Sequence, residues 1–253
     1  MSAKLFRTTA GLTLAVAALG LSAVPASAAT DHTGPRITVK TVKTDVTLPA
    51  KGVHLIHFTE RVVDHGGVAK VQFAVLNGTT LLTYPDGSPI TVRMHRISGS
   101  SHDGIWEGQI ALDRSMLPGS FTVSTVALDK AGNQSKVKAV GEFHARWQTS
   151  VAQVKVTPVS SGALHKGDPL TVSGRLNLAS AAGWVGLPAT SLDVLFLPKG
   201  KHTAVKVGTV TTDANGNFSD ASAFTYRGKG EWRVSYAGSA NNAPDLSSGV
   251  TFN

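Results

Sequence analysis

The sequence predicts an all-β protein with two tandem β-sandwich domains behind an N-terminal leader, and three observations lead to this prediction. Apolar and polar residues alternate along short segments such as 53–58, 68–76 and 121–128. Because successive residues of a strand point to opposite faces, each such segment can bury one face and expose the other. Turn-forming clusters such as Asp64–Gly67 and Ala131–Asn133 separate the segments, since glycine and asparagine tolerate the backbone angles that turns require. After the leader, no long stretch has the apolar spacing of an amphipathic helix.

Residues 1–28 have the pattern of a secretory signal peptide. Lys4 and Arg7 precede an apolar stretch at 10–24, and the small residues Ala26–Ala28 follow it, which predicts cleavage after Ala28. The apolar stretch of about fifteen residues is shorter than the ~20 residues that a membrane-spanning helix needs. We therefore expect an extracellular, secreted protein with no integral membrane anchor after cleavage.

The rest of the chain is long enough for two domains. About 225 residues follow the leader, which fits two domains of roughly 100 to 120 residues each. We expect the first at 29–146 and the second at 147–253, joined within 141–150 by a short junction that lacks the glycine and serine of a flexible linker. Seven strands are expected in the second domain, at 151–157, 170–178, 191–197, 204–212, 216–224, 230–237 and 249–252. Its candidate core residues are Leu170, Val172, Leu176, Leu192, Val194, Phe196, Trp232, Val234 and Tyr236.

Composition narrows the classes of partner. The chain has no cysteine, so its stability depends on apolar burial and hydrogen bonds without disulfides. It has 24 basic and 16 acidic residues, for a net charge of +8. Such an excess attracts anionic neighbours such as wall polymers or acidic polysaccharides. No run of five or more basic residues forms a nucleic-acid-binding arm, so we expect no nucleic acid as a partner.

Four short motifs occur in the first half, namely Asp31–Ile37, Asp64–Val68, Asp103–Trp106 and Ala127–Asn133. With these motifs the first half resembles the bacterial immunoglobulin-like modules of secreted and surface proteins. In such modules the closing Asp-x-Ala-Gly-Asn element ends a late strand and turns into the last one. The resemblance implies an immunoglobulin-like β-sandwich over most of residues 31–143.

Three further motifs occur in the second half, namely Leu170–Leu176, Thr211–Phe218 and Gly230–Gly238. With these motifs the second half is similar to a module found in secreted proteins of actinobacteria. The resemblance implies a second immunoglobulin-like sandwich and an origin among secreted proteins. It does not imply a ligand, because sandwich modules serve adhesion, spacing and ligand capture alike.

Four oxygen-bearing side chains in turns of the first domain are candidate calcium ligands, namely Asp64, Asp103, Asp129 and Asn133. Calcium takes six to eight oxygen ligands from carboxylates, amides and carbonyls. The same residue types also stabilise turns by accepting hydrogen bonds from their own backbone. We therefore expect turn chemistry and no cofactor, with calcium as the one candidate that stays possible.

Catalytic sites are not expected. His54 and His57 are three residues apart, so on a strand their rings point to opposite faces and do not share a zinc ion. Ser101–Asp103 are consecutive, and three consecutive residues do not form a hydrolase triad. No nucleophile elbow, metalloprotease motif or phosphate-binding glycine loop is present. The sequence therefore predicts a protein that is not an enzyme.

Trp184 is the candidate ligand-binding residue. It lies within 181–188, a segment without a strand pattern that we expect to be an exposed loop, whereas Trp232 alternates with Val234 and Tyr236 as a core residue does. An exposed indole offers a flat apolar surface that can stack on a sugar ring.

Together these features predict a secreted, non-enzymatic protein with tandem immunoglobulin-like domains. Its expected role is binding or structural, at the cell wall or in the extracellular matrix, with an extracellular protein or a cell-wall polysaccharide as partner. Two alternatives stay open, a carbohydrate-binding module protein that uses Trp184 and a calcium-binding extracellular spacer.

Overall fold

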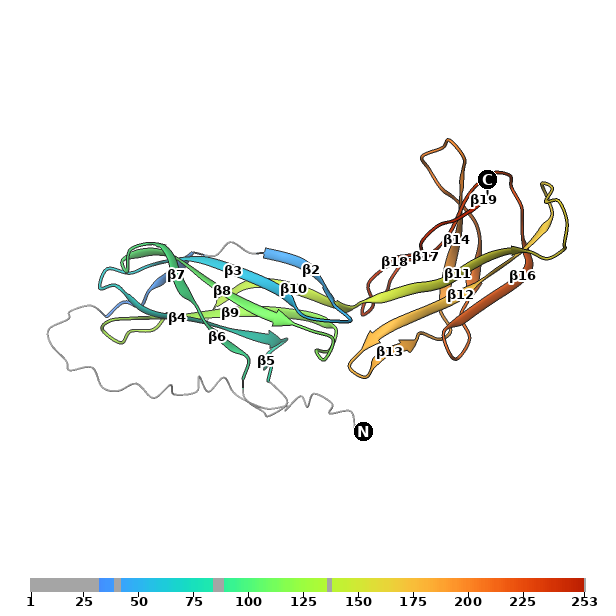
Figure 1. Cartoon of the computed structure of the whole chain (residues 1–253). Coiled ribbons are helices and arrows are strands. Elements are labelled where there is room, and N and C mark those ends of the chain that lie inside the picture. The colour runs from blue at the N-terminus through green and yellow to red at the C-terminus, as the bar shows by residue number, and fades with distance from the viewer. Residues whose placement is uncertain (1–31, 39–41, 84–88, 136–137, 253) are drawn as a thin grey trace. The chain divides into compact units, whose positions relative to one another are not determined.

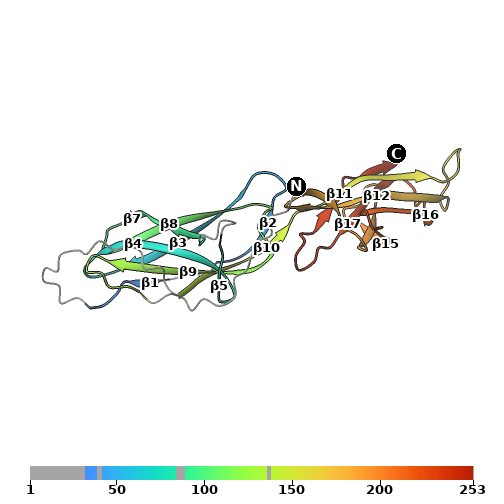
Figure 2. The ribbon, with the colours of Figure 1, turned by 90° about the horizontal axis from the view of Figure 1, so that it is seen from below.

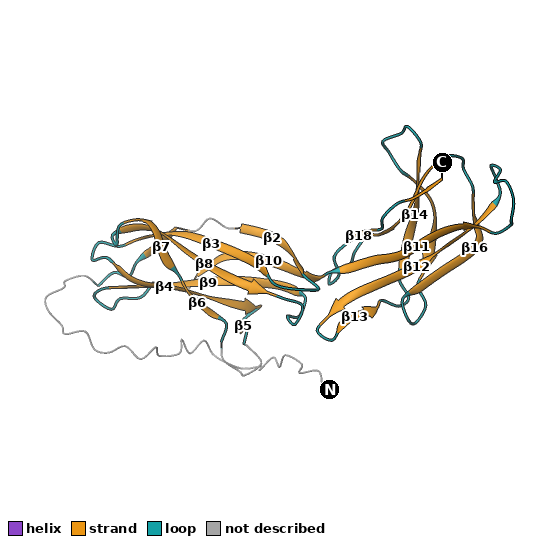
Figure 3. Cartoon of the chain, viewed as in Figure 1, coloured by secondary structure: helices purple, strands orange, loops and turns teal. Residues whose placement is uncertain are grey.

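A computed structural model describes residues 32–38, 42–83, 89–135 and 138–252 (Figure 1). The predicted signal peptide at 1–28 lies outside the described residues. Within the described ranges the chain consists of strands, turns and loops, without a helix (Figure 3). Accordingly, no helix in these ranges is long and apolar enough to cross a membrane. The predicted all-β class is confirmed.

The chain forms two compact units. Among the described residues, unit 1 comprises those up to Val46 and those from Val53 to Ala145, and unit 2 comprises Thr47–Gly52 and those from Arg146 onward. The segment 141–150 contains the end of one long strand and the start of the next. The sequence limits 29–146 and 147–253 stay a prediction.

Unit 1 contains two sheets whose inner faces enclose its core. One sheet has the strand order β1-β3-β8-β7, and the other has the order β2-β10-β9-β4-β5 with β6 also paired to β4. Their bounds are β1 Arg36–Thr38, β2 Val42–Leu48, β3 His54–Val63, β4 Val68–Asn77, β5 Thr80–Leu81, β6 Thr91–Arg93, β7 His95–Gly99, β8 Asp103–Leu112, β9 Gly119–Asp129 and β10 Lys138–Trp147. The central pair β3 and β8 is antiparallel over its whole length, and the two strands run side by side in both views (Figures 1 and 2).

Apolar residues at alternating positions of these strands together form the core of unit 1. Phe58 of the first sheet meets Phe73 of the second edge to face at a centroid distance of 5.2 Å. Phe121 and Phe143, on neighbouring strands of the second sheet, stack at 5.1 Å. Aromatic pairs in these geometries add to the free energy gained from area burial, by about 0.5–1.5 kcal/mol. The residues that alternate with these core residues along each strand point outward, and they are the side chains that each sheet presents to solvent.

Unit 2 also contains two sheets. In the first, β12 pairs with β11, β13 and β16, and the second has the order β15-β14-β17-β18 with β19 also paired to β17. Their bounds are β11 Thr149–Pro158, β12 Pro169–Ser180, β13 Gly183–Gly186, β14 Ser191–Pro198, β15 Val205–Thr211, β16 Asn217–Thr225, β17 Gly230–Tyr236, β18 Asp245–Leu246 and β19 Val250–Phe252.

The predicted core of the second domain is confirmed. All nine residues named from the sequence are buried, and they belong to one apolar cluster. Trp232 lies at its centre, fully buried, with ring centroids 5.2 Å from Phe196 and 6.5 Å from Phe224.

The strand orders identify the fold. In the letters used for immunoglobulin domains, β1-β3-β8-β7 is an A-B-E-D sheet, and β10-β9-β4 is the G-F-C part of the facing sheet. In unit 2, β11, β12 and β16 correspond to A, B and E, while β14, β17 and β19 correspond to C, F and G. Both units are immunoglobulin-like β-sandwiches.

A short segment that begins with the last two residues of β2 belongs to unit 2, although it precedes most of unit 1 in the chain. Within Thr47–Gly52, the carbonyl of Leu48 accepts a hydrogen bond from the Gln148 backbone N–H at 3.1 Å. The Ala50 N–H donates to the Gln148 side-chain carbonyl Oε1 at 2.8 Å. Leu48 and Ala50 are both buried. Unit 2 is therefore built from two separate stretches of the polypeptide.

Candidate functional site

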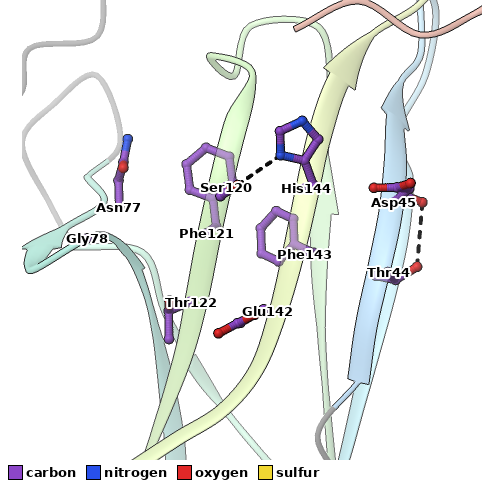
Figure 4. A pocket seen from close by; sticks show the side chains of 10 residues that line it. All are labelled: Thr44, Asp45, Asn77, Gly78, Ser120, Phe121, Thr122, Glu142, Phe143 and His144. Atoms are coloured by element: carbon purple, nitrogen blue, oxygen red, sulfur yellow. Dashed lines mark hydrogen bonds between the residues drawn. The ribbon is translucent and has the colours of Figure 1, made fainter. Parts of the chain in front are cut away.

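A hollow of about 620 Å³ opens on the outer face of the second sheet of unit 1 (Figure 4). Strands β2, β9 and β10 and the turn after β4 supply its walls. The lining residues are Thr44, Asp45, Asn77, Gly78, Ser120, Phe121, Thr122, Glu142, Phe143 and His144. It is open to solvent, so a segment of a large partner can enter it.

Strand alternation explains why polar groups face this hollow. Phe121 and Phe143 are directly opposite each other in the register of β9 and β10, and both are buried in the core. Their neighbours therefore point to the outer face. The same register puts Ser120 opposite His144 and Thr122 opposite Glu142.

One hydrogen bond orients the imidazole of the hollow. The Ser120 hydroxyl Oγ lies 2.9 Å from Nδ1 of His144 (Figure 4). Asp45 belongs to β2, the strand next to β10 in the sheet, and also lines the hollow (Figure 4). The bond between Ser120 and His144 therefore fixes the direction of the imidazole ring in the hollow.

The lining of the hollow is rich in hydrogen-bonding groups. Asp45 and Glu142 contribute carboxylates, Asn77 an amide, and Ser120 and Thr122 hydroxyls. Asp45, Glu142 and His144 also have interactions within the protein. The hollow is therefore suited to a partner that presents several hydrogen-bonding groups.

Sequence reasoning missed this site, because its residues are far apart in the chain. Asp45, Ser120 and His144 belong to three different strands. Only the strand pairing brings them together. The one signal in the sequence is the polar residue on each side of the buried Phe121 and Phe143, which a period of two puts on a common outer face.

Three of the four candidate calcium ligands have side-chain partners within the protein. Asp103 pairs with the guanidinium of Arg61, whose Nε lies 2.7 Å from Oδ1. The hydrogen bond from Arg61 lowers the pKa of Asp103. Asp129 is buried and accepts hydrogen bonds from the Asn133 backbone N–H at 2.7 Å and from the Asn133 side-chain amide at 2.8 Å.

Asp64 is the fourth residue of this set. It is buried directly after β3, its N–H donates to the His102 carbonyl at 2.9 Å, and among the described residues its Oδ1 has no hydrogen-bond partner. Across the described part of the chain, no three acidic or histidine side chains gather in a metal-binding arrangement. Calcium binding at Asp64, Asp103, Asp129 and Asn133 stays the alternative to turn chemistry.

We expect calcium to leave the melting temperature of the protein unchanged to within about 1 °C. A ligand that binds only the folded state must raise that temperature by mass action, but Asp103 is held by Arg61 and Asp129 by Asn133. Calcium needs six to eight oxygen ligands. The check is a thermal melt in millimolar calcium and in excess chelator. A melting temperature that is clearly higher in calcium than in chelator would support the calcium-binding spacer as the function.

The structure corrects the predicted surroundings of Trp184. This residue lies in the short strand β13 rather than in a loop, and it pairs with Ala179 of β12. The segment is too short for alternation to be visible, and the small residues Ala181 and Ala182 before it conceal the hairpin. Its indole is 45% exposed, whereas Trp106 and Trp232 are buried. Its role in ligand binding stays a prediction.

Unit 1 also contains a buried carboxylate on its core side. Glu60 alternates with the core residues Phe58 and Val62 on β3, and its side chain is 3% exposed. Oε1 accepts a hydrogen bond from the Thr125 hydroxyl at 2.6 Å, and among the described residues Oε2 has no partner. Burial raises the pKa of Glu60 from 4.5 to about 7, although the bond from Thr125 opposes the shift. Glu60 is therefore a structural group that titrates near neutral pH.

No family model and no curated protein matches the chain. Solved structures do match. The crystal structure of DIP-gamma IG1+IG2 is 12% identical over 87% of this chain and 95% of that chain, with a TM-score of 0.33. The D00-D0 domain of intimin is 13% identical over 87% of this chain and 99% of that chain, with a TM-score of 0.30.

A third similar structure is that of the fibronectin(III)-like modules of CbhA from Clostridium thermocellum. It is 13% identical over 83% of this chain and 91% of that chain, with a TM-score of 0.26. Likenesses at these TM-scores carry no argument about activity or partner. The assignment of the fold rests on the strand orders described above.

Proposed function

We propose that this protein is a secreted, non-enzymatic binding protein of the actinobacterial type, with immunoglobulin-like modules at 29–146 and 147–253. Its place of action is the cell wall or the extracellular matrix, and its partner is an extracellular protein. The hollow on unit 1 is the surface that holds this partner.

The hollow itself carries this proposal. Its polar side chains come from strands of a rigid sheet, and the stacked Phe121 and Phe143 beneath them fix the strands. A binding site on strands is held more accurately than one on loops. Because the hollow is open and lined by carboxylate, amide and hydroxyl groups, it fits a polar segment that projects from a protein surface.

A second candidate function is favoured by one observation. Trp184 is 45% exposed on β13, and the next residue, Val185, is 39% exposed. An indole of this exposure can stack on a sugar ring. We propose carbohydrate recognition at Trp184 as the alternative function.

The test is a retention experiment with the mature chain, residues 29–253. Immobilised extracellular proteins, wall sacculi and insoluble polysaccharides are each incubated with wild type and with the double variant Asp45→Asn, Glu142→Gln. We expect the double variant to lose retention on the protein fraction by about fivefold or more, because interfacial charge pairs contribute to affinity. Loss of polysaccharide retention in Trp184→Ala would instead favour the alternative function.

A matched control changes the outer face of the other sheet of unit 1. The variant Asp103→Asn, Glu107→Gln alters the net charge by the same amount, and both residues lie on β8. It should bind the protein fraction like wild type. Equal retention of all three proteins would contradict a partner site in the hollow.

A further inference from the structure

Three loops at one end of unit 2 carry a group of exposed basic side chains. One loop precedes β12, one connects β14 to β15, and one connects β16 to β17. Their cations are Lys166, Lys199, Lys201, Arg227 and Lys229, all exposed. We call these five residues the basic loop cluster.

Strand pairing brings the three loops to the same end of the sandwich. Pro169 at the start of β12 is opposite Thr225 at the end of β16. Pro198 at the end of β14 is opposite Gly230 at the start of β17. The loops therefore leave the two sheets at neighbouring positions, although 63 residues separate Lys166 from Lys229.

Backbone hydrogen bonds tie the loops to one another. The Lys199 N–H donates to the Lys229 carbonyl at 3.0 Å. The Gly167 N–H donates to the Tyr226 carbonyl at 2.9 Å, and the Tyr226 N–H donates to the Asp168 carbonyl at 2.8 Å. Between Lys199 and Lys201 the chain turns at Gly200, whose φ of 78° suits glycine. The basic side chains thus project from a connected set of turns.

The acidic side chains of Asp168 and Glu231, which lie next to these loops, contact residues that are not in the cluster. Asp168 accepts a hydrogen bond from the His165 backbone N–H at 2.6 Å and lies 3.7 Å from the His165 ring. Glu231 pairs with Arg233 at 2.6 Å. In the described part of the chain, none of the five cations forms an ion pair. Lys206, by contrast, pairs with Asp193 at 2.6 Å and is not counted in the cluster.

We propose that the basic loop cluster binds a linear anionic polymer of the wall or matrix, whose negative groups recur along a flexible chain. Cations crowded on adjoining turns repel one another, and a multivalent anion relieves this repulsion. Four of the five are lysines, whose flexible ammonium groups act as point charges and do not require one fixed anion geometry. This surface lies in unit 2, so it is independent of the hollow in the proposed function.

The test measures binding of the mature chain to alginate, which carries carboxylates, and to polyphosphate, with neutral dextran as a blank. Wild type should bind one or both polyanions in ~50 mM salt and release them in ~1 M salt, where screening acts within about 3 Å. The variant Lys199→Gln, Lys201→Gln, Arg227→Gln, Lys229→Gln should bind at least about tenfold more weakly, because it loses four charge contacts. Tighter binding to alginate would indicate recognition of carboxylates, and tighter binding to polyphosphate would indicate recognition of phosphates.

A matched variant separates the cluster from net charge. Lys51→Gln, Arg93→Gln, Arg96→Gln, Lys155→Gln removes four exposed cations from outside the cluster and should bind within about threefold of wild type. Equal weakening in both variants, or no binding by wild type at low salt, would overturn the proposal. The hollow variant Asp45→Asn, Glu142→Gln should bind the polyanions like wild type, so failure of either proposal is recognisable separately.

Discussion

Glu60→Gln should make unit 1 more stable than wild type by about 3 kcal/mol at pH 8, with a difference near zero at pH 4. Glutamine has the size of glutamate and can still accept the hydrogen bond from Thr125. It removes the need to bury a charge above neutral pH, and a buried charge without full compensation is strongly unfavourable.

The pH dependence follows from the raised pKa. Burial moves the pKa of Glu60 from 4.5 to about 7 in the folded protein. Between these two values the folded state holds a proton that the unfolded state has released, so wild-type stability falls as pH rises through this window and is constant above it. A shift of this size corresponds to about 3 kcal/mol.

Urea denaturation at pH 4, 6 and 8 measures the effect. Glu107→Gln is the control, because Glu107 lies on the outer face near His57 and His95, where exposed ion pairs contribute about 0–1 kcal/mol. A wild-type unfolding free energy that does not fall between pH 4.5 and 7 would show that Glu60 is not protonated in the folded state.

Trp232→Ala should remove about 3–5 kcal/mol from the stability of unit 2, the range found for large aromatic residues in cores. The side chain is fully buried between Phe196 and Phe224, and alanine leaves a cavity there. Since domains are stable by only about 5–15 kcal/mol, unit 2 should melt at a much lower temperature.

Amide hydrogen exchange measures the loss of stability in each unit separately. Protection should fall in β14 and β17, which carry Phe196 and Trp232, and should persist in β9 of unit 1. Trp184→Ala is the matched control, because an exposed substitution usually changes stability by less than about 0.5 kcal/mol. Equal loss of protection in both units would show that the effect is not confined to the core around Trp232.

Alternation of residue type predicted much of this fold. The segments 170–178, 191–197 and 230–237 are strands, and the apolar residues chosen in them are the core of unit 2. This worked because burial on one face imposes a period of two that a single sequence reveals. The same period puts Glu60 on the inner face of β3, between Phe58 and Val62, but its acidic type argues for exposure.

The functional surfaces could not be predicted in the same way. The hollow depends on the register between β9 and β10, and the basic loop cluster depends on pairs such as Pro198 with Gly230. Neither register leaves a local pattern, because residues that meet across strands are distant in the chain. Trp184 was correctly expected to be exposed, but four residues of strand were too few to show alternation.

The polypeptide enters unit 2 twice, first at Thr47–Gly52 and again from Arg146 onward. No single cut of the backbone can therefore release both sandwiches whole. A fragment that starts after Ala145 lacks the apolar Leu48 and Ala50 and leaves the Gln148 side chain without the Ala50 N–H. A gene fusion or deletion with its boundary at Arg146 therefore removes part of unit 2.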